Sequence, residues 1–240
     1  MRQAYTASVS IRTTSIGLIS LGFLLVSCAK SGMPKTGTGA PLSDKAKASI
    51  LKGVAAGNAI AEFELGAMEH DGDGVPKDLG KAFELFSKAA AQGERRAQFN
   101  LGLMYAQGDG IPQDEGKARE WFQKAADQGD GRAQFNLGLL YYQGQGVPRS
   151  FAQALEFFQT AAKNGIAEAQ ENIGVMNVRG EGTPQNMIDA YAWFLLAAKS
   201  GRSSAKESAM KLGAHLTADQ IAKATKRAEE IGKEFTKKGK

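Results

Sequence analysis

The chain has 240 residues and carries 30 lysines and arginines against 25 aspartates and glutamates, with a single cysteine. One cysteine cannot close an internal disulfide, so a folded domain must be stabilised by packing alone. Residues 223–240 hold seven basic and three acidic side chains, so the excess positive charge belongs to the C-terminal end. A nucleic-acid-binding protein should present a basic face on its folded body, and this sequence predicts none.

The first residues have the pattern of a secretory signal peptide. Arg2 and Arg12 precede the apolar run 16–26, whose 11 residues fit a signal core. The run is well short of the ~20 residues that a membrane-spanning helix requires. It ends in Leu25-Val26-Ser27-Cys28, which resembles the lipobox of bacterial lipoproteins. The resemblance implies that Cys28 is lipidated and becomes the first residue after cleavage.

Cleavage at this point would remove residues 1–27 and leave a lipid anchor at the new N-terminus. Ala29 stands where an inner-membrane retention signal has aspartate, so attachment to the outer membrane, facing the periplasm, is expected. Residues 28–42 are mostly small or polar, with glycine and proline, and predict a flexible tether. The alternative is an ordinary secretory peptide in which the cysteine is incidental.

A 36-residue period runs through most of the chain. The stretch FNLGLMYAQGDGIPQD at 99–114 is followed by FNLGLLYYQGQGVPRS at 135–150. Glycines recur on the same spacing, at Gly57, Gly93, Gly129, Gly165 and Gly201. A period of about 20 to 50 residues indicates stacked supersecondary units. Four full copies are expected, at 57–92, 93–128, 129–164 and 165–200.

Each copy predicts two helices around a glycine-proline loop. In the second copy, one helical face carries Ala97, Leu101 and Met104, and another carries Ala118, Trp121, Phe122 and Ala125. The loop GDGIP between them is incompatible with a helix. Two residues after each loop proline stands a good N-cap for the second helix: Asp78, Asp114, Ser150 and Asn186. A glycine in the middle of each first helix, such as Gly102, costs about 1 kcal/mol against alanine, which predicts close contact with a neighbouring helix.

These residues bring the chain close to a known family. The pattern A-x-x-x-L-G-x-M-Y-x-x-G-x-G-x-P-x-D, followed by K-A-x-x-W-F-x-K-A-A-x-x-G, spans Ala97 to Gly129 and resembles the Sel-one-like repeat, a longer-looped relative of the tetratricopeptide repeat. The resemblance covers residues 57–200. It implies an all-α fold, a right-handed α-solenoid of antiparallel helix hairpins with four full 36-residue repeats.

A solenoid also needs ends that tolerate water. Residues 43–56 align with a lone second helix and are predicted to cap the N-terminal end. Residues 201–240 are predicted to form C-terminal capping helices and a basic tail. There, Thr217-Ala218-Asp219-Gln220 has the form of a capping box. The helix that it opens carries one apolar face, made of Ile221, Ala224, Ala228, Ile231 and Phe235.

The resemblance implies a partner-binding concave surface lined by the first helices. In the two middle copies this surface would be an apolar groove rimmed by two arginines, formed by Arg96, Phe99, Leu103, Arg132, Phe135, Leu139, Tyr142 and Gln143. The Lys/Asn pattern with which some relatives hold a terminal carboxylate is missing, which favours a hydrophobic or helical partner segment. The alternative is that these side chains only pack between neighbouring first helices.

Catalytic constellations are sparse. The two histidines, His70 and His215, are not repeated, and the single cysteine is assigned to the anchor. His70 with Asp71 and Asp73 lies in a turn, where polar and glycine residues are expected anyway. We therefore predict no catalytic residues, no metal and no cofactor.

The leading functional hypothesis is a membrane-anchored scaffold or assembly factor of the bacterial cell envelope that binds a protein or peptide partner. One alternative is an enzyme that binds or hydrolyses cell-wall peptides or β-lactams, as has been linked to cysteine-rich relatives, although their paired cysteines are absent here. Another is a passive spacer on the membrane. The sequence leaves open the partner, the pathway, the oligomeric state and whether the protein faces the periplasm or the outside of the cell.

Overall fold

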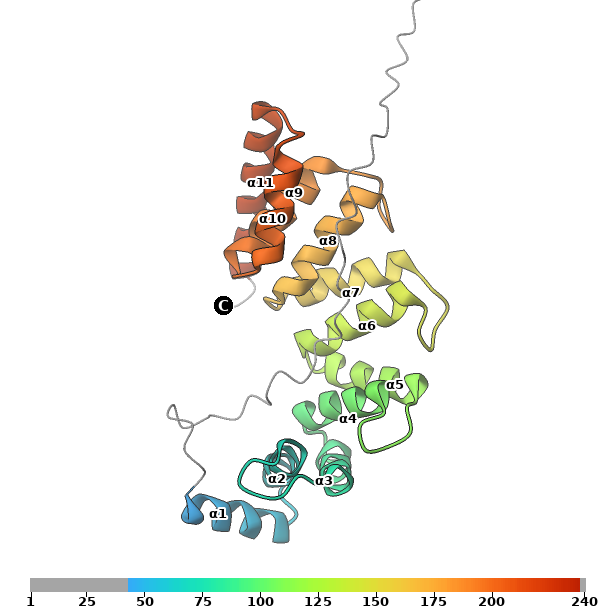
Figure 1. The fold of residues 1–240 in the computed structure, drawn as a ribbon, viewed down its shortest axis with the longest axis vertical. Coiled ribbons are helices and arrows are strands. Elements are labelled where there is room, and N and C mark those ends of the chain that lie inside the picture. The colour runs from blue at the N-terminus through green and yellow to red at the C-terminus, as the bar shows by residue number, and fades with distance from the viewer. Residues whose placement is uncertain (1–42, 238–240) are drawn as a thin grey trace, which may run out of the picture.

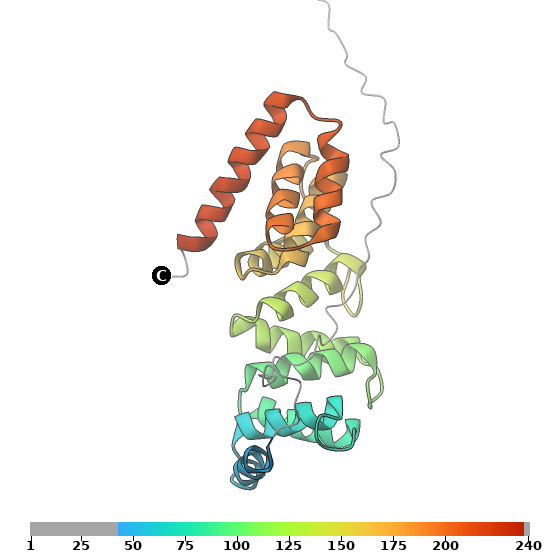
Figure 2. The same cartoon turned by 60° about the vertical axis from the view of Figure 1, so that its left-hand side comes forward.

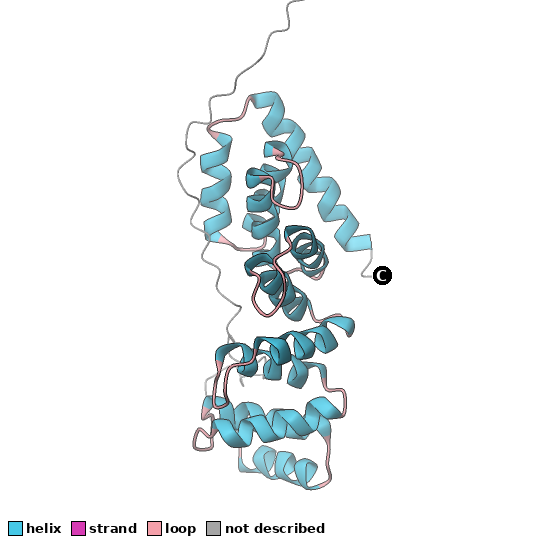
Figure 3. Ribbon diagram, turned by 90° about the vertical axis from the view of Figure 1, so that its right-hand side faces the viewer, coloured by secondary structure: helices cyan, strands magenta, loops and turns pink. Residues whose placement is uncertain are grey.

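The computed structural model describes residues 43–237, with side chains to residue 235, and within this range the chain is built from helices without strands (Figures 1 and 3). The predicted lipidation site, Cys28, the signal peptide and the tether lie outside the described residues. No helix of the described range is long and apolar enough to cross a membrane. The helices are α1 (Asp44–Ala55), α2 (Ala59–Asp71), α3 (Leu79–Ala91), α4 (Arg95–Gln107), α5 (Glu115–Asp127), α6 (Gly131–Gln143), α7 (Phe151–Lys163), α8 (Ala167–Arg179), α9 (Met187–Lys199), α10 (Ser203–Gly213) and α11 (Ala218–Lys237).

The helices form a stack of hairpins, as predicted. The pairs α2–α3, α4–α5, α6–α7 and α8–α9 are the hairpins, and each helix from α1 to α9 packs against the next along the chain. Figure 1 shows the stack running from α1 at the bottom to the C-terminal helices at the top. The prediction of an all-α solenoid with capping helices is confirmed.

The second helices begin where the N-cap pattern predicts. The carboxylate of Asp114 accepts a hydrogen bond from the backbone N–H of Lys117 at 2.9 Å, and Asp78 makes the equivalent contact with Lys81 at 3.0 Å. These backbone donors hold the pKa of both carboxyl groups below its ordinary value. Ser150 and Asn186 cap α7 and α9 in the same position, so the hairpin geometry is set identically in each copy.

The mid-helix glycines receive the phenylalanine ring of their own hairpin. A Cβ built on Gly138 would lie 2.6 Å from Cδ1 of Phe158, and one on Gly102 would lie 2.5 Å from the same atom of Phe122. Both rings are fully buried. Glycine therefore allows the first helix to approach the ring closely, and the gain in packing offsets its poor helix propensity.

The C-terminal end departs from the repeat. Helix α11 turns back and packs against α9 instead of pairing with α10, and Figure 2 shows it as a long helix beside the end of the stack. Ala224 and Ala228 pack with Ala192, and the ring of Phe235 lies 6.1 Å from that of Trp193. Helix α9 is predominantly apolar, which fits its packing against three helices, α8, α10 and α11.

The predicted capping box of α11 is confirmed. The N–H of Thr217 donates to the side chain of Gln220 at 2.9 Å, and the N–H of Gln220 donates to the Thr217 hydroxyl at 3.3 Å. Helix α10 ends the row of first helices. Met210 occupies the place of the mid-helix glycine there and is 68% exposed, since no second helix packs against it.

Candidate partner-binding face

Each first helix has a side that packs on the second helices, and contacts in α6 identify it. Gly138 lies against Phe158 of α7, and the side-chain amide of Gln134 donates to the carbonyl of Ala126 in α5 at 3.4 Å. Asn136 is two positions from both residues and so lies about 200° around the helix from each. Asn136 therefore points away from the layer of second helices.

We call the surface on this opposite side the first-helix face. It consists of four positions per repeat, spaced so that they follow one stripe along the helix. In α2 they are Ile60, Glu64, Ala67 and Asp71; in α4, Arg96, Asn100, Leu103 and Gln107; in α6, Arg132, Asn136, Leu139 and Gln143; and in α8, Glu168, Asn172, Val175 and Arg179.

Five of the eight predicted groove residues lie on this face: Arg96, Leu103, Arg132, Leu139 and Gln143. Phe99, Phe135 and Tyr142 lie beside it, and the rings of Phe99 and Phe135 pack against Phe122 and Phe158 at 5.9 and 5.6 Å. The four apolar members, Phe99, Leu103, Phe135 and Leu139, are each no more than 2% exposed and belong to the core clusters. Their burial agrees with the alternative given in the sequence analysis, in which these side chains pack inside the stack and do not line an open apolar groove. Partner binding by this set stays a prediction, and its accessible members are the polar ones.

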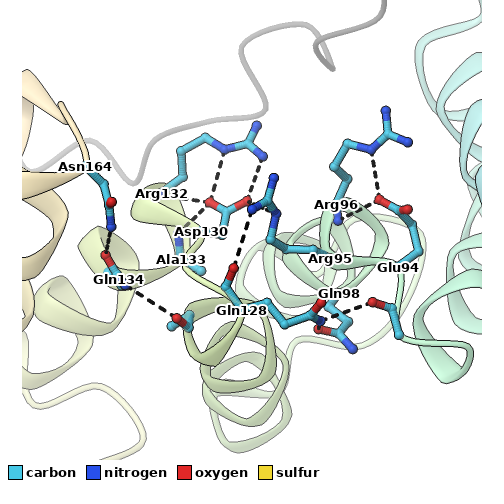
Figure 4. Close-up of polar contacts among 12 residues, drawn as sticks. Glu94, Arg95, Arg96, Gln98, Gln128, Asp130, Arg132, Ala133, Gln134 and Asn164 are labelled. Atoms are coloured by element: carbon cyan, nitrogen blue, oxygen red, sulfur yellow. Dashed lines mark hydrogen bonds and ion pairs between the residues drawn. The ribbon is translucent and has the colours of Figure 1, made fainter. Parts of the chain in front are cut away.

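The two rim arginines connect neighbouring repeats. The guanidinium of Arg96 lies over the Phe63 ring and that of Arg132 over the Phe99 ring, each 4.3 Å from the centroid. Figure 4 shows both arginines directed toward the carboxylate two residues earlier. The Arg132–Asp130 distance is 2.9 Å and the Arg96–Glu94 distance 2.8 Å. These contacts fix the position of both positive charges.

The charge at the first position of the face changes sign at the fourth repeat. Glu168 stands at the position that Arg96 and Arg132 occupy in earlier copies. Arg202, from the turn before α10, reaches Glu168 at 3.1 Å and Glu171 at 2.9 Å. Two carboxylates thus share one arginine here, whereas around α4 and α6 three arginines (Arg95, Arg96 and Arg132) lie near two carboxylates.

A ladder of polar side chains lies on the opposite, packed side of the first helices. Each rung joins two residues 30 positions apart in the same repeat: Gln92 to Glu62 at 2.7 Å, Gln128 to Gln98 at 2.8 Å, Asn164 to Gln134 at 2.7 Å and Ser200 to Gln170 at 3.2 Å. Three of the inner residues also donate to a carbonyl of the preceding second helix. The sequence analysis did not predict this ladder. Its signal in the sequence is a glutamine that directly follows the repeated alanine in three copies, at Gln98, Gln134 and Gln170.

Two further pairs cross from one repeat to the next with a separation of 39 residues. The Nε2 of His70 lies 3.0 Å from Asp109, and the Tyr142 hydroxyl donates to Glu181 at 2.6 Å. Burial, followed by the Glu181 contact, raises the pKa of Tyr142 to about 12. His70 also contacts Asp71 at 2.8 Å, but the described residues contain no group of three side chains suited to a metal ion. These pairs therefore connect repeats.

Comparisons with known proteins agree with this architecture. The Sel1 repeat model matches residues 59–94, 95–130, 131–166 and 167–201, so its copies begin at the first helices, two residues after the predicted boundaries. The crystal structure of a Sel1 repeat protein from Oxalobacter formigenes is 32% identical, with 78% of this chain and 79% of that chain covered and a TM-score of 0.68. The structure of c5321, a protective antigen present in uropathogenic Escherichia coli strains displaying an SLR fold, is 28% identical over 78% of this chain and 48% of that one, with a TM-score of 0.54. No curated protein sequence matches. With four matched repeats over more than half of its length, the chain belongs to the Sel1 repeat family.

Proposed function

We propose that the protein is a lipid-anchored scaffold of the bacterial cell envelope that binds a protein partner through its first-helix face. Sel1 repeat proteins generally act as non-enzymatic scaffolds in protein–protein interactions. The observation that carries the proposal here is the construction of that face. Arg96 and Arg132 are partly exposed, with 37% and 39% of their side chains accessible, and are held by ion pairs and aromatic rings. Charges fixed in this way can select and orient a partner.

The anchoring part of the proposal rests on residues 1–42. A lipidated Cys28 at the start of the tether 28–42 would hold the repeats about 20 Å from the membrane if the tether behaves as a flexible coil. The test is incorporation of labelled palmitate into the wild type and into Cys28→Ala. Label in the wild type alone supports the anchor, and equal labelling or equal membrane retention of the two would remove it.

Photocrosslinking in intact cells tests partner binding. A photoreactive residue at Gln107 or Gln143 would probe the first-helix face, and one at Gln159 on α7 would serve as the matched control on the opposite surface. These glutamines are exposed or half-buried, so the substitution leaves the core intact. A discrete adduct from the first-helix face alone supports the proposal. Silence at Gln107 and Gln143, or the same adducts from all three sites, would count against it.

A further inference from the structure

The helix at the N-terminal end, α1, aligns with the second helices of the repeats, so its solvent-facing positions can be compared with theirs. One such position is glutamate in α3, α5 and α7 but alanine in the first and last copies, Ala48 in α1 and Ala192 in α9. Three residues later the middle helices have serine or glutamine, whereas α1 and α9 have Leu51 and Leu195. The two outermost copies therefore share an apolar surface that the middle copies lack.

In α9 this surface is covered by the C-terminal helix. Ala192 is fully buried against Ala224 and Ala228 of α11, and Leu195 packs on the same cluster. In α1 the surface is open: Leu51 is 56% exposed, and the helix has no buried residue, since among the described helices it packs chiefly against α2. Figure 1 shows α1 at the lower end of the stack. Helix α1 thus has the surface of a covered helix, but within the described residues nothing covers it.

We call this surface the α1 face. Ala48, Leu51 and Ala55 follow one stripe of the helix at spacings of three and four residues, and Lys45 and Lys52 lie along its edge, two turns apart. All five residues are exposed. A short apolar stripe bordered by lysines is the pattern of a helix that lies in the interface of a membrane.

The lysines of the α1 face lack the carboxylates that accompany their counterparts. Lys81 and Lys117, at the position of Lys45 in the next two copies, each lie 3.5 Å from the aspartate that caps their helix, whereas the N-cap of α1 is a serine. In α3 and α5 the lysine equivalent to Lys52 follows a glutamate by four residues, but Lys52 follows Ala48. Three lysines against one aspartate give α1 a net positive charge.

We propose that the α1 face docks on the surface of an anionic lipid bilayer, with Leu51 at the level of the headgroups and Lys45 and Lys52 beside the lipid phosphates. This inference rests on the lipid anchor of the proposed function, and it adds a second contact that fixes which end of the stack meets the membrane. Lysine stems extend over apolar surface while the ammonium groups stay in water near the phosphates. An anionic membrane surface attracts basic side chains close to it, and salt weakens the attraction.

The position of α1 in the chain makes the bilayer its nearest surface. The predicted tether, residues 28–42, ends where α1 begins, and it contains Lys30 and Lys35 but no acidic residue. A short linker holds its two ends at an effective concentration of roughly millimolar, so a contact too weak to bind a free protein suffices for an anchored one. A second copy of α1 fits less well, because it would place lysines against lysines.

Site-specific fluorescence on the full-length lipidated protein tests the inference. The protein is reconstituted into vesicles of phosphatidylcholine alone or of phosphatidylcholine with phosphatidylglycerol. Because acylation consumes the thiol of Cys28, a polarity-sensitive dye can be attached to one introduced cysteine, Ala48→Cys on the α1 face or Glu156→Cys at the same repeat position of α7. In the anionic vesicles we expect a blue-shifted emission and a several-fold loss of quenching by acrylamide for the dye at position 48. The dye at position 156 should behave alike in both kinds of vesicle.

Two variants test the side chains of the α1 face. Leu51→Gln introduces the residue that α5 has at this position, Gln123, and Lys45→Gln with Lys52→Gln removes both charges; all three changed positions are exposed, so the helix is retained. The double lysine variant should lower the ratio of docked to free α1 by about thirtyfold, equivalent to about 2 kcal/mol. Leu51→Gln should restore part of the quenching, and raising the salt concentration should do so in the wild type without any substitution.

The inference is overturned if the dye at position 48 responds equally in both kinds of vesicle, if the dye at position 156 is shielded as well, or if the double lysine variant responds like the wild type. Shielding that depends on the density of protein in the vesicle, or disulfide crosslinks between two copies of Ala48→Cys, would overturn it in favour of a second copy. A protein that incorporates palmitate but keeps position 48 exposed loses this inference and retains the proposed function. Failure to incorporate palmitate removes the anchor, and this inference with it.

Discussion

Replacing Gly138 by alanine should destabilise the protein, although alanine is the better helix former. The added methyl carbon would lie 2.6 Å from two atoms of the Phe158 ring, and contacts this short must open by about 1 Å. The ring is fully buried among Ala154, Ala161 and other core residues, so it cannot move freely. Overpacking of this kind costs about 1 to 3 kcal/mol or more, whereas the propensity gain is about 1 kcal/mol. We expect a net loss of about 1 kcal/mol, and up to about 2 kcal/mol at the upper end of the overpacking cost.

Urea denaturation followed by circular dichroism measures this loss, with Gly116→Ala as the control. Gly116 also lies in a helix, but a Cβ there would meet only a carboxylate oxygen of Asp114, at an ordinary 3.4 Å. Its replacement should be neutral or stabilising by up to about 1 kcal/mol. If Gly138→Ala proves as stable as Gly116→Ala, the close-approach explanation of the repeated glycine is wrong.

A double mutant locates the strain. Phe158→Leu removes part of the ring that the new methyl group would strike, so combining it with Gly138→Ala should cost less than the sum of the two single changes. Additive losses would mean that the methyl group acts through another contact, and the assignment of Phe158 as the obstacle would fail.

Two further predictions concern charged and polar contacts between repeats. The folded-state pKa of Tyr142 is raised from 10.0 to about 12, so its contribution to stability is complete below pH 10 and is lost as pH rises toward 12. An absorbance titration should find one tyrosine that ionises at a higher pH than the others in the wild type, and this tyrosine should be missing in Tyr142→Phe. Arg202→Gln leaves Glu168 and Glu171 without their shared cation and should lower the unfolding free energy by about 1 kcal/mol or less, because the arginine is part exposed. The loss should shrink in high salt, and a salt-independent loss would show that Arg202 acts through packing.

The sequence predicted the parts of the fold that recur. Asp114 and Ser150 cap their helices where the pattern placed them, and Gly102 receives a neighbouring ring as its repetition suggested. These positions are predictable because the same local geometry is built four times. A residue type that recurs at one position in every copy is required by that geometry, whereas a chance occurrence would not recur.

The parts that occur once were harder to predict. Nothing in the periodic pattern indicates that α11 packs back on α9, although the apolar stretch YAWFLLAA shows that α9 needs cover on every side. The burial of Phe99 and Phe135 was open at the sequence level, because a helical pattern gives the direction of a side chain but not what lies over it. The side-chain amide of Asn136 is fully buried and has no hydrogen-bond partner among the described residues, which only coordinates can show, since it depends on every neighbouring helix.

Variation between copies gives an argument about where specificity lies. The residues Ala61, Ala97, Ala133 and Ala169 are all alanine and are nearly or fully buried, so a larger side chain there would overpack the core. The residues immediately before them are Ile60, Arg96, Arg132 and Glu168. Stacking cannot require any one of these, because the same backbone position accepts an apolar, a basic and an acidic side chain in a single molecule. The differences therefore change the surface while leaving the fold intact, and they lie along the face that we propose as the partner site.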